Sequence, residues 1–211
     1  MRCDKKDLLL YGVTDRSWLG DRTLAQQVEA SLRGGATMIQ LREKHMDRGS
    51  ILAQALELRE LCGRYGVPLI LNDDAELAQA AGADGVHVGQ SDMEAGRVRA
   101  LLGEDKLIGV SARTVEQALA AQAAGADYLG CGAVFGSGTK HNVSQMSLET
   151  LTAICQAVDI PVVAIGGVNL DNLSLLAGTG IAGVAVISGL FAPEDKTAAA
   201  QGFLQQLEGL I

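Results

Sequence analysis

The segment "AGADGVHVG" at residues 81–89 returns in altered form as "AGADYLGCG" at residues 124–132. In both copies a glycine and small residues lead into a short apolar run, a pattern typical of a helix C-cap followed by a buried strand. Related entries, "GGA" at 34–36 and "GTGIAG" at 178–183, precede two further apolar runs. The recurrence predicts a fold built from repeated strand and helix units.

Counting outward from these entries gives eight apolar runs that alternate with longer segments of helical periodicity. One such segment is 49–66, where apolar residues recur at helical spacing. The apolar runs are nearly continuous, as parallel strands covered on both faces should be. The predicted strands span residues 8–14, 36–42, 67–72, 84–89, 106–111, 126–132, 160–167 and 181–188.

Two kinds of strand entry alternate along the chain. The glycine entries precede the even-numbered strands, whereas odd-numbered strands follow entries such as "GVPLIL" (66–71) and "DIPVVAI" (159–165). Such alternation favours a closed barrel, because alternate strands fill the interior layers of that fold. An open doubly wound sheet is the alternative, but "TDRSWLGD" (14–21) follows the first strand in place of G-x-G-x-x-G. We therefore expect a single α/β domain, a (β/α)8 TIM barrel over residues 1–211.

Composition narrows the possible environment and partners. The chain is 48% hydrophobic but only 3% aromatic, so aliphatic side chains must fill its core. A net charge of −8 argues against nucleic acid as a partner. Four scattered cysteines without a C-x-x-C pair predict reduced thiols, and no apolar run reaches the ~18 residues of a membrane span. We expect a cytoplasmic protein without a secretory signal or a membrane partner; its oligomeric state is left open.

Polar residues gather at the predicted C-terminal ends of the strands, which form the active face of such barrels. In "MIQLREK" (38–44), Gln40, Arg42 and Lys44 alternate with apolar residues and so share one face of the strand. A charge within that alternation needs a partner. The planar fork of arginine and the point charge of lysine together suit a diphosphate, and we expect Lys140 to join them from the loop after the sixth strand.

Two aspartates follow neighbouring predicted strands. Asp73 and Asp92 can approach one site, where Mg²⁺ is held by one or two carboxylates together with phosphate oxygens. Helix N-capping is the competing interpretation for each of them, and for Asp74 and Ser91, because a helix is expected after both segments. Capping explains neither the pair nor the cations on the neighbouring strands.

A second anion site is indicated by "GSGTK" (136–140), Gly166–Gly167 and "ISG" (187–189). Glycine lets backbone N–H groups approach an anion closely. Barrels of this kind commonly bind a phosphomonoester at the C-terminal ends of strands seven and eight. His87 lies within a predicted strand and is expected to be a hydrogen-bonded core residue. No Ser-His-Asp constellation can be assembled. The residues thus predict an enzyme with one diphosphate site using Mg²⁺ and one monophosphate site.

In this order, the motifs resemble the signatures of the thiamine-phosphate synthase family over essentially the whole chain. The resemblance implies that a 4-amino-2-methylpyrimidine bearing a diphosphooxymethyl group is joined to a thiazole ethyl phosphate. The products would be thiamine monophosphate and diphosphate. The matching motifs are "QLREK" (40–44), "NDD" (72–74), "HVGQSD" (87–92), "GVSA" (109–112), "GAVFGSGTK" (132–140), "IGGVN" (165–169) and "VISG" (186–189).

The resemblance also implies roles for the matched residues. Asp73 and Asp92 would bind Mg²⁺, and the chemistry would be dissociative: diphosphate leaves and the thiazole nitrogen captures a pyrimidine-stabilised cation. The implied catalytic residues are Arg42, Lys44, Ser111 and Lys140. The implied substrate-binding residues are Gln40, Leu41, Arg42, Glu43, Lys44, Asn72, Ser111, Ser137, Gly138, Thr139, Lys140, Gly167, Ile187 and Ser188.

The chain departs from the family pattern in a few places. Ala133 and Gly136–Ser137 stand where many relatives have prolines or Pro-Thr, and Arg113 stands where histidine is common. None of these changes removes a charged ligand. Two other functions compete: a thiazole tautomerase paralogue on the same barrel, which needs only the monophosphate site, and a non-catalytic phosphate-binding protein. Retention of the cations and of the aspartate pair argues against both.

Overall fold

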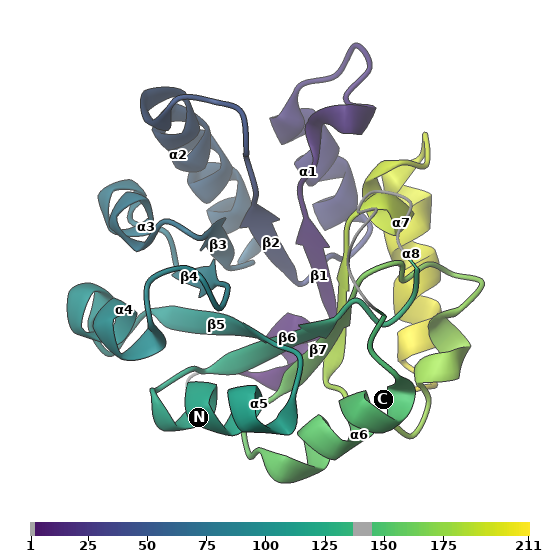
Figure 1. Cartoon of the computed structure of the whole chain (residues 1–211). Helices are drawn as coiled ribbons and strands as arrows, with labels where there is room; N and C mark the ends of the chain where they lie inside the picture. Colours follow the sequence, from purple (N-terminus) through teal and green to yellow (C-terminus); the bar gives the residue numbers. More distant parts are fainter. Residues whose placement is uncertain (1–2, 137–144) are drawn as a thin grey trace.

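Eight parallel strands pair in sequence order, and the last returns to the first, so the sheet closes into a barrel (Figure 1). The computed structural model describes residues 3–136 and 145–211. All eight predicted strands are confirmed, most of them shorter by one or two residues at an end, and the TIM-barrel fold is confirmed with them. The strands are β1 (Leu10–Val13), β2 (Met38–Leu41), β3 (Leu69–Asn72), β4 (Gly85–Val88), β5 (Leu107–Ala112), β6 (Tyr128–Gly132), β7 (Val162–Ile165) and β8 (Gly183–Val186).

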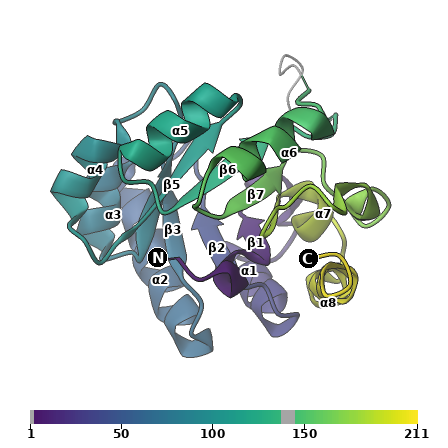
Figure 2. The same ribbon diagram turned by 90° about the horizontal axis from the view of Figure 1, so that it is seen from below.

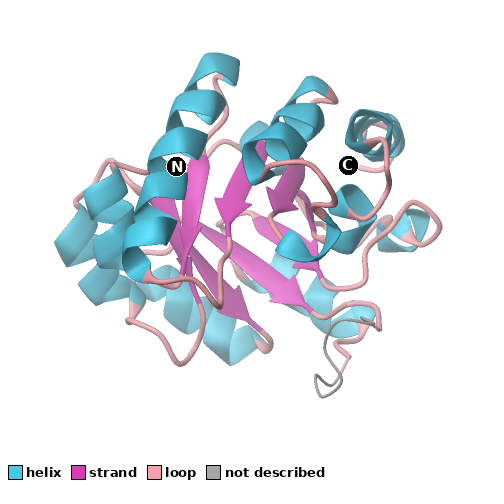
Figure 3. Ribbon diagram, turned by 90° about the horizontal axis from the view of Figure 1, so that it is seen from above, coloured by secondary structure: helices cyan, strands magenta, loops and turns pink. Residues whose placement is uncertain are grey.

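Helices lie around the outside of the strands (Figures 2 and 3). The α-helices are α1 (Leu24–Arg33), α2 (Arg48–Tyr65), α3 (Ala75–Ala81), α4 (Ala95–Leu102), α5 (Val115–Ala123), α6 (Leu148–Ala157), α7 (Ser188–Phe191) and α8 (Lys196–Leu207). Short 3-10 helices are η1 (Lys5–Leu8), η2 (Arg16–Trp18) and η3 (Leu173–Leu176). In the described part of the chain, every helix is too short or too polar to cross a lipid bilayer.

The sequence marks where most helices begin and end. Oxygen-bearing side chains accept a hydrogen bond from a backbone N–H of the first helical turn, which satisfies a donor that the helix itself cannot. Gly66 and Gly82 end α2 and α3 in the left-handed region, where glycine carries no steric penalty. The capping residues of the α-helices are Thr23, Asp47, Asp74, Thr114, Ser147 and Asp195.

The repeat of strand and α-helix is interrupted after β7, where the 3-10 helix η3 takes the place of an α-helix. Asn172 accepts from the Asn169 N–H at 2.9 Å, and Asn169 accepts from the Asp171 N–H at 2.9 Å. Such side-chain turns compete with helical hydrogen bonding. Gly178 and Gly180, both at positive φ, then turn the chain toward β8.

Alternation along the strands divides the side chains between two cores. Leu10, Ile39 and Leu41 pack outward with the helices, whereas Tyr11 and Met38 pack inside the barrel. Gln40 follows Met38 by two residues and therefore faces inward, one step nearer the C-terminal end of the barrel.

The N-terminal segment fills the opposite end of the barrel. Cys3 and Leu8 are fully buried in the inner core together with Tyr11 and Tyr128. A Cβ on Gly183 would overlap the Leu8 carbonyl, so the segment lies directly against β8. Within the described residues, this segment therefore closes that end of the barrel, opposite the C-terminal mouth.

Candidate active site

A cavity of about 120 Å³ opens at the C-terminal mouth of the barrel. We call it the mouth cavity. It is formed by inward-facing side chains near the ends of the strands, which is where such barrels hold their ligands. The mouth cavity brings together five of the residues that the sequence places at the site: Gln40, Arg42, Asn72, Ser111 and Ile187. Its other lining residues are Tyr11, Val13, His87, Gly130, Val163, Ile165 and Ala185.

Thr14 fixes the end of β2, where the first cations lie. Its N–H donates to the Gln40 carbonyl at 3.0 Å, and its hydroxyl accepts from the Arg42 N–H at 3.0 Å. Thr14 itself is fully buried. These two hydrogen bonds to Thr14, the residue after β1, extend the strand-like path of the chain beyond Leu41. Arg42 therefore faces inward like Gln40 and lines the mouth cavity.

The segment after Arg42 forms a second hollow of about 260 Å³, which we call the loop cavity. Glu43 and Lys44 line it, and Arg42 lines both cavities. The Glu43 carboxylate accepts from Arg16 Nε at 2.6 Å and is almost completely buried. This pair holds Arg16, from η2, near the other cations of the loop cavity.

Leu41 lies differently from its neighbours. Its side chain is 1% exposed and packs in the outer core between the strands and the helices. Any contact of Leu41 with a ligand in the mouth therefore has to be made by its backbone.

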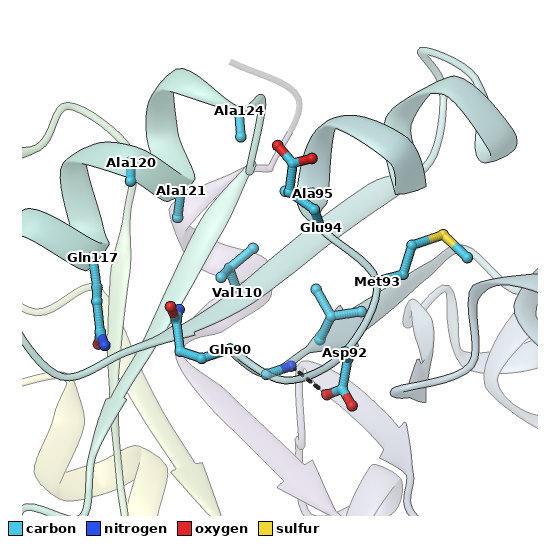
Figure 4. A pocket seen from close by; sticks show the side chains of 12 residues that line it. Gln90, Asp92, Met93, Glu94, Ala95, Val110, Gln117, Ala120, Ala121 and Ala124 are labelled. Atoms are coloured by element: carbon cyan, nitrogen blue, oxygen red, sulfur yellow. Dashed lines mark hydrogen bonds between the residues drawn. The ribbon is translucent and has the colours of Figure 1, made fainter.

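The two aspartates lie on adjacent turns at the mouth. Burial and the negative charge of Asp92 raise the pKa of Asp73, whereas Lys44 and Asn72 act in the opposite direction. Asp92 accepts from the Gly89 N–H at 2.7 Å, at the edge of a cavity of about 190 Å³ between α4 and α5 (Figure 4). The mutual repulsion of two carboxylates beside a lysine makes this a place for a cation.

The backbone at Asp73 is held in an unusual conformation. Its φ of 66° lies in the left-handed region, which non-glycine residues seldom adopt. Its N–H donates to the His87 carbonyl at 2.8 Å, which ties the turn after β3 to β4. Strain of this kind persists only where the surrounding structure enforces it, and it gathers at functional sites.

The residues present fit Mg²⁺. Within residues 3–136 and 145–211 there is no group of three or more His, Cys, Asp or Glu side chains that could hold a metal, so the donor set of a structural or catalytic zinc site is not found there. Mg²⁺ requires less of the protein, because it keeps several waters and completes its shell with substrate phosphate oxygens. Asp73 and Asp92, close to Lys44, would supply the two carboxylates for such a site.

Helix capping accounts for a third aspartate. Asp74 accepts from the Leu77 N–H at 2.7 Å and caps α3. At α4 the cap position is Glu94, which makes no side-chain capping bond. Capping therefore applies to Asp74, and neither Asp73 nor Asp92 caps its helix.

Asp74→Ala is expected to lower the free energy of unfolding by about 1 kcal/mol, the usual loss on removing a helix N-cap. Because Asp74 caps α3 and does not belong to the aspartate pair, the Mg²⁺ requirement should stay as in the unmodified chain. Urea denaturation and a Mg²⁺ titration of activity measure the two effects. A changed Mg²⁺ requirement would assign Asp74 to the metal site.

His87 and Ser111 form a polar contact inside the mouth cavity. Ser111 Oγ lies 2.9 Å from His87 Nε2, and His87 Nδ1 lies 3.3 Å from the Tyr128 hydroxyl. Burial lowers the pKa of His87 to about 4, so the imidazole is neutral near pH 7. The expected hydrogen-bonded core histidine therefore also lines the cavity. Tyr11 and Tyr128 were not singled out by the sequence, although strand alternation places both on the inner face.

The turns after β6 and β7 meet where the monophosphate site is expected. Gly166 and Gly167 have φ of 98° and 70°, and a Cβ on Gly167 would lie 2.7 Å from the Phe135 carbonyl oxygen. Directly after the neighbouring strand β8, Ile187 occupies the N-cap position of α7 and Ser188 is its first residue. The expected contacts of Ser137, Gly138, Thr139 and Lys140 lie outside the described residues.

Comparison with known proteins agrees with this arrangement. The sequence model of the family described as thiamine monophosphate synthase matches residues 10–190. A thiamine-phosphate synthase of Ruminiclostridium cellulolyticum is 45% identical over 201 residues, covering 95% of this chain and 96% of the relative. Thiamine-phosphate synthase 2 of Streptococcus pneumoniae is 41% identical over 208 residues, covering 99% of both chains.

A solved structure, that of thiamine phosphate pyrophosphorylase from Pyrococcus furiosus, superimposes with a TM-score of 0.89 at 35% identity. The match covers 98% of each chain. Fold, motif order and full-length similarity thus point to the same group of transferases. The chain belongs to the thiamine monophosphate synthase family.

Proposed function

We propose that the chain condenses 4-amino-2-methyl-5-(diphosphooxymethyl)pyrimidine with a thiazole ethyl phosphate to give thiamine monophosphate and diphosphate. One observation carries the proposal: inward-facing Gln40 and Arg42 lie at the same mouth as the aspartate pair. A diphosphate ester needs both positive side chains and a hard cation. The names and the full-length similarity of the relatives support the same reaction.

Charge on the leaving group decides the mechanism. In the proposed step the bond between the pyrimidine methylene carbon and the diphosphate oxygen breaks, and the electron pair leaves with the oxygen. Arg42 and Lys44 stabilise that negative charge, with Lys140 expected to assist. Mg²⁺, held by Asp73 and Asp92, would neutralise further charge on the diphosphate oxygens.

The thiazole nitrogen then donates its lone pair to the methylene carbon and forms the new C–N bond. No protein nucleophile is needed, so the protein has to orient the two rings and exclude water from the cation. Val163, Ile165 and Ile187 line the mouth cavity with apolar surface suited to that task. Gly167, Ile187 and Ser188 are assigned to the thiazole phosphate, together with Ser137, Gly138 and Thr139.

The remaining assignments complete the proposed environment of the reaction. Glu43 contributes by holding Arg16, Leu41 contributes through its backbone, and Asn72 and Ser111 contact the pyrimidine substrate. The four cysteines are free thiols, three of them buried, which suits a reducing cytoplasm.

Mixing the protein with both substrates and Mg²⁺ is expected to release one diphosphate per thiamine monophosphate formed. Omitting either substrate or the metal should abolish release. A coupled diphosphate assay with product chromatography measures both. Rearrangement of a thiazole phosphate tautomer without diphosphate release would indicate the tautomerase activity, and binding of both substrates without turnover would indicate a phosphate-binding protein.

A further inference from the structure

A continuous chain of hydrogen bonds crosses the interior of the barrel from β2 to β5. Gln40 Nε2 lies 2.6 Å from the Tyr11 hydroxyl, which lies 2.9 Å from the Tyr128 hydroxyl. The Tyr128 hydroxyl lies 3.3 Å from His87 Nδ1, and His87 Nε2 lies 2.9 Å from Ser111 Oγ. Both ends of this chain, which we call the interior relay, line the mouth cavity.

The surrounding strands leave space for the interior relay and for little else. A Cβ on Gly109 would overlap the Tyr128 ring and His87 Nδ1, and a Cβ on Gly130 would lie 2.9 Å from His87 Cε1. The two tyrosine rings pack edge to face with centroids 5.9 Å apart, and neither residue is more than 1% exposed. The relay is therefore a fixed part of the core.

The direction of every bond in the relay follows from the amide at one end. The Gln40 NH₂ group can only donate, so the Tyr11 hydroxyl accepts it and has its one proton left for Tyr128. Tyr128 then donates to His87 Nδ1. A neutral imidazole carries one N–H, which therefore resides on Nε2 and points to Ser111.

Burial keeps the protonation states that this direction requires. It lowers the pKa of His87 to about 4 and raises the pKa values of Tyr11 and Tyr128. Each link thus has one proton at neutral pH, and reversing one link requires reversing all of them.

At the mouth the relay leaves an acceptor on one wall and a donor on the other. One of the two N–H groups of the Gln40 amide donates to Tyr11 inside the relay, and Oε1 is the acceptor that the amide has left for a ligand. Ser111 accepts from His87, so its hydroxyl proton is left for a ligand. The two residues come from β2 and β5, which β3 and β4 separate.

We propose that the interior relay selects a 4-aminopyrimidine over a 4-oxopyrimidine, with Tyr11, Tyr128 and His87 as the positioning residues. The 4-amino group donates to Gln40 Oε1, and the ring nitrogen para to it accepts from Ser111. This specificity rests on the proposed function, whose pyrimidine substrate carries the amino group.

A 4-oxopyrimidine has a hydrogen-bond mismatch either with Gln40 or with Ser111. Its carbonyl oxygen meets Gln40 Oε1, acceptor against acceptor. If the Gln40 amide flips to donate to that carbonyl, every hydrogen bond of the relay reverses, and the Ser111 hydroxyl then donates to His87. The lone pairs of Ser111 then face the ring nitrogen, so the mismatch moves to the other side of the ring. Sites that leave buried polar groups unpaired reject such analogues strongly.

The test compares kcat/KM for the amino substrate and for its 4-oxo analogue, each with saturating thiazole phosphate and Mg²⁺. The unmodified protein should prefer the amino substrate by about 10³-fold or more. Tyr128→Phe interrupts the relay, so the Gln40 amide can flip without affecting Ser111. The preference for the amino substrate should then fall about tenfold or more. The KM for the thiazole phosphate should not change, whereas a general loss of structure would alter that KM as well.

Tyr11→Phe cuts the relay at its other tyrosine and should have the same effect. Because the relay is already cut, the double variant should lose no more preference than either single variant. Tyr65→Phe is the matched control: it removes a phenolic hydroxyl from the surface of α2, where Tyr65 donates to Glu29. Its preference should equal that of the unmodified protein.

The outcomes separate this inference from the proposed function. Absence of diphosphate release from the amino substrate would overturn the proposed function. With release observed, a preference near one in the unmodified protein would overturn the relay, and this measurement needs no variant. An unchanged preference in folded Tyr128→Phe or Tyr11→Phe, or additive losses in the double variant, would overturn it as well.

Discussion

Asp92→Asn is expected to lower kcat by about 10²-fold or more while leaving the barrel folded. The change removes one of the two carboxylates that would hold Mg²⁺ against the diphosphate. It preserves the size of the side chain, and the asparagine oxygen can still accept from the Gly89 N–H that Asp92 binds at 2.7 Å. Loss of activity can then be attributed to loss of charge and not to collapse of the turn after β4.

A Mg²⁺ titration of diphosphate release measures this effect, and the half-saturating concentration should rise in the variant. Asp105→Asn is the control, since Asp105 is exposed in the turn before β5, at the opposite end of the barrel. Full activity of Asp92→Asn at the Mg²⁺ concentration used by the unmodified chain would remove Asp92 from the metal site.

The same variant has a readout that does not depend on activity. Burial and the charge of Asp92 raise the pKa of Asp73, so the folded state is penalised at pH values where Asp73 is ionised in the unfolded chain. Without metal near pH 7, Asp92→Asn should therefore unfold at the same or a higher temperature than the unmodified protein. The difference should vanish as the pH falls and Asp73 becomes protonated in both proteins. Added Mg²⁺ should stabilise the unmodified protein more than the variant.

Strand periodicity predicts which side chains face the barrel interior, but only within the strands. The alternation in 38–44 predicts one face for Gln40, Arg42 and Lys44. Gln40 and Arg42 line the mouth cavity, whereas Lys44 lies beyond the end of β2 and lines the loop cavity. The eight strands followed from apolar runs and their glycine entries. Both signals are local, and a closed parallel barrel is built from local units joined in sequence order.

Contacts between distant loops had no such signal. Glu43 and Arg16 are 27 residues apart, and their pair depends on how the loop after β1 folds over the loop after β2. No spacing rule relates two irregular segments. The resemblance implies that Glu43 binds substrate, because it lies within "QLREK" (40–44), and the structure pairs its carboxylate with Arg16.

The interior relay was hidden for a different reason. Tyr11 and Tyr128 lie 117 residues apart, and their hydroxyls meet because the barrel register brings the two strands' inner faces to one level. Strand alternation predicts that each tyrosine faces the barrel interior, but it does not predict the level of each ring along the barrel axis. The left-handed backbone of Asp73 was equally unmarked, because that conformation is usually signalled by glycine.

Arg42→Gln should raise the KM for the pyrimidine diphosphate about 10²-fold, because two charge-assisted hydrogen bonds to phosphate oxygens are lost. The KM for the thiazole phosphate should change little, since its proposed site lies at β7 and β8. Arg42→Lys should recover only part of the loss: lysine restores the charge but not the planar fork. Initial rates with each substrate varied in turn measure the two KM values.

The control for this prediction is Arg33→Gln, which removes the same side chain from the last turn of α1. Arg33 is exposed and pairs with Glu29 at 3.3 Å, so its loss should alter stability by less than ~1 kcal/mol and neither KM. The argument turns on the difference between the two substrates and not on the size of either effect. If Arg42→Gln weakens both substrates equally, one shared patch of positive potential binds both anions, and two separate phosphate sites no longer describe this barrel.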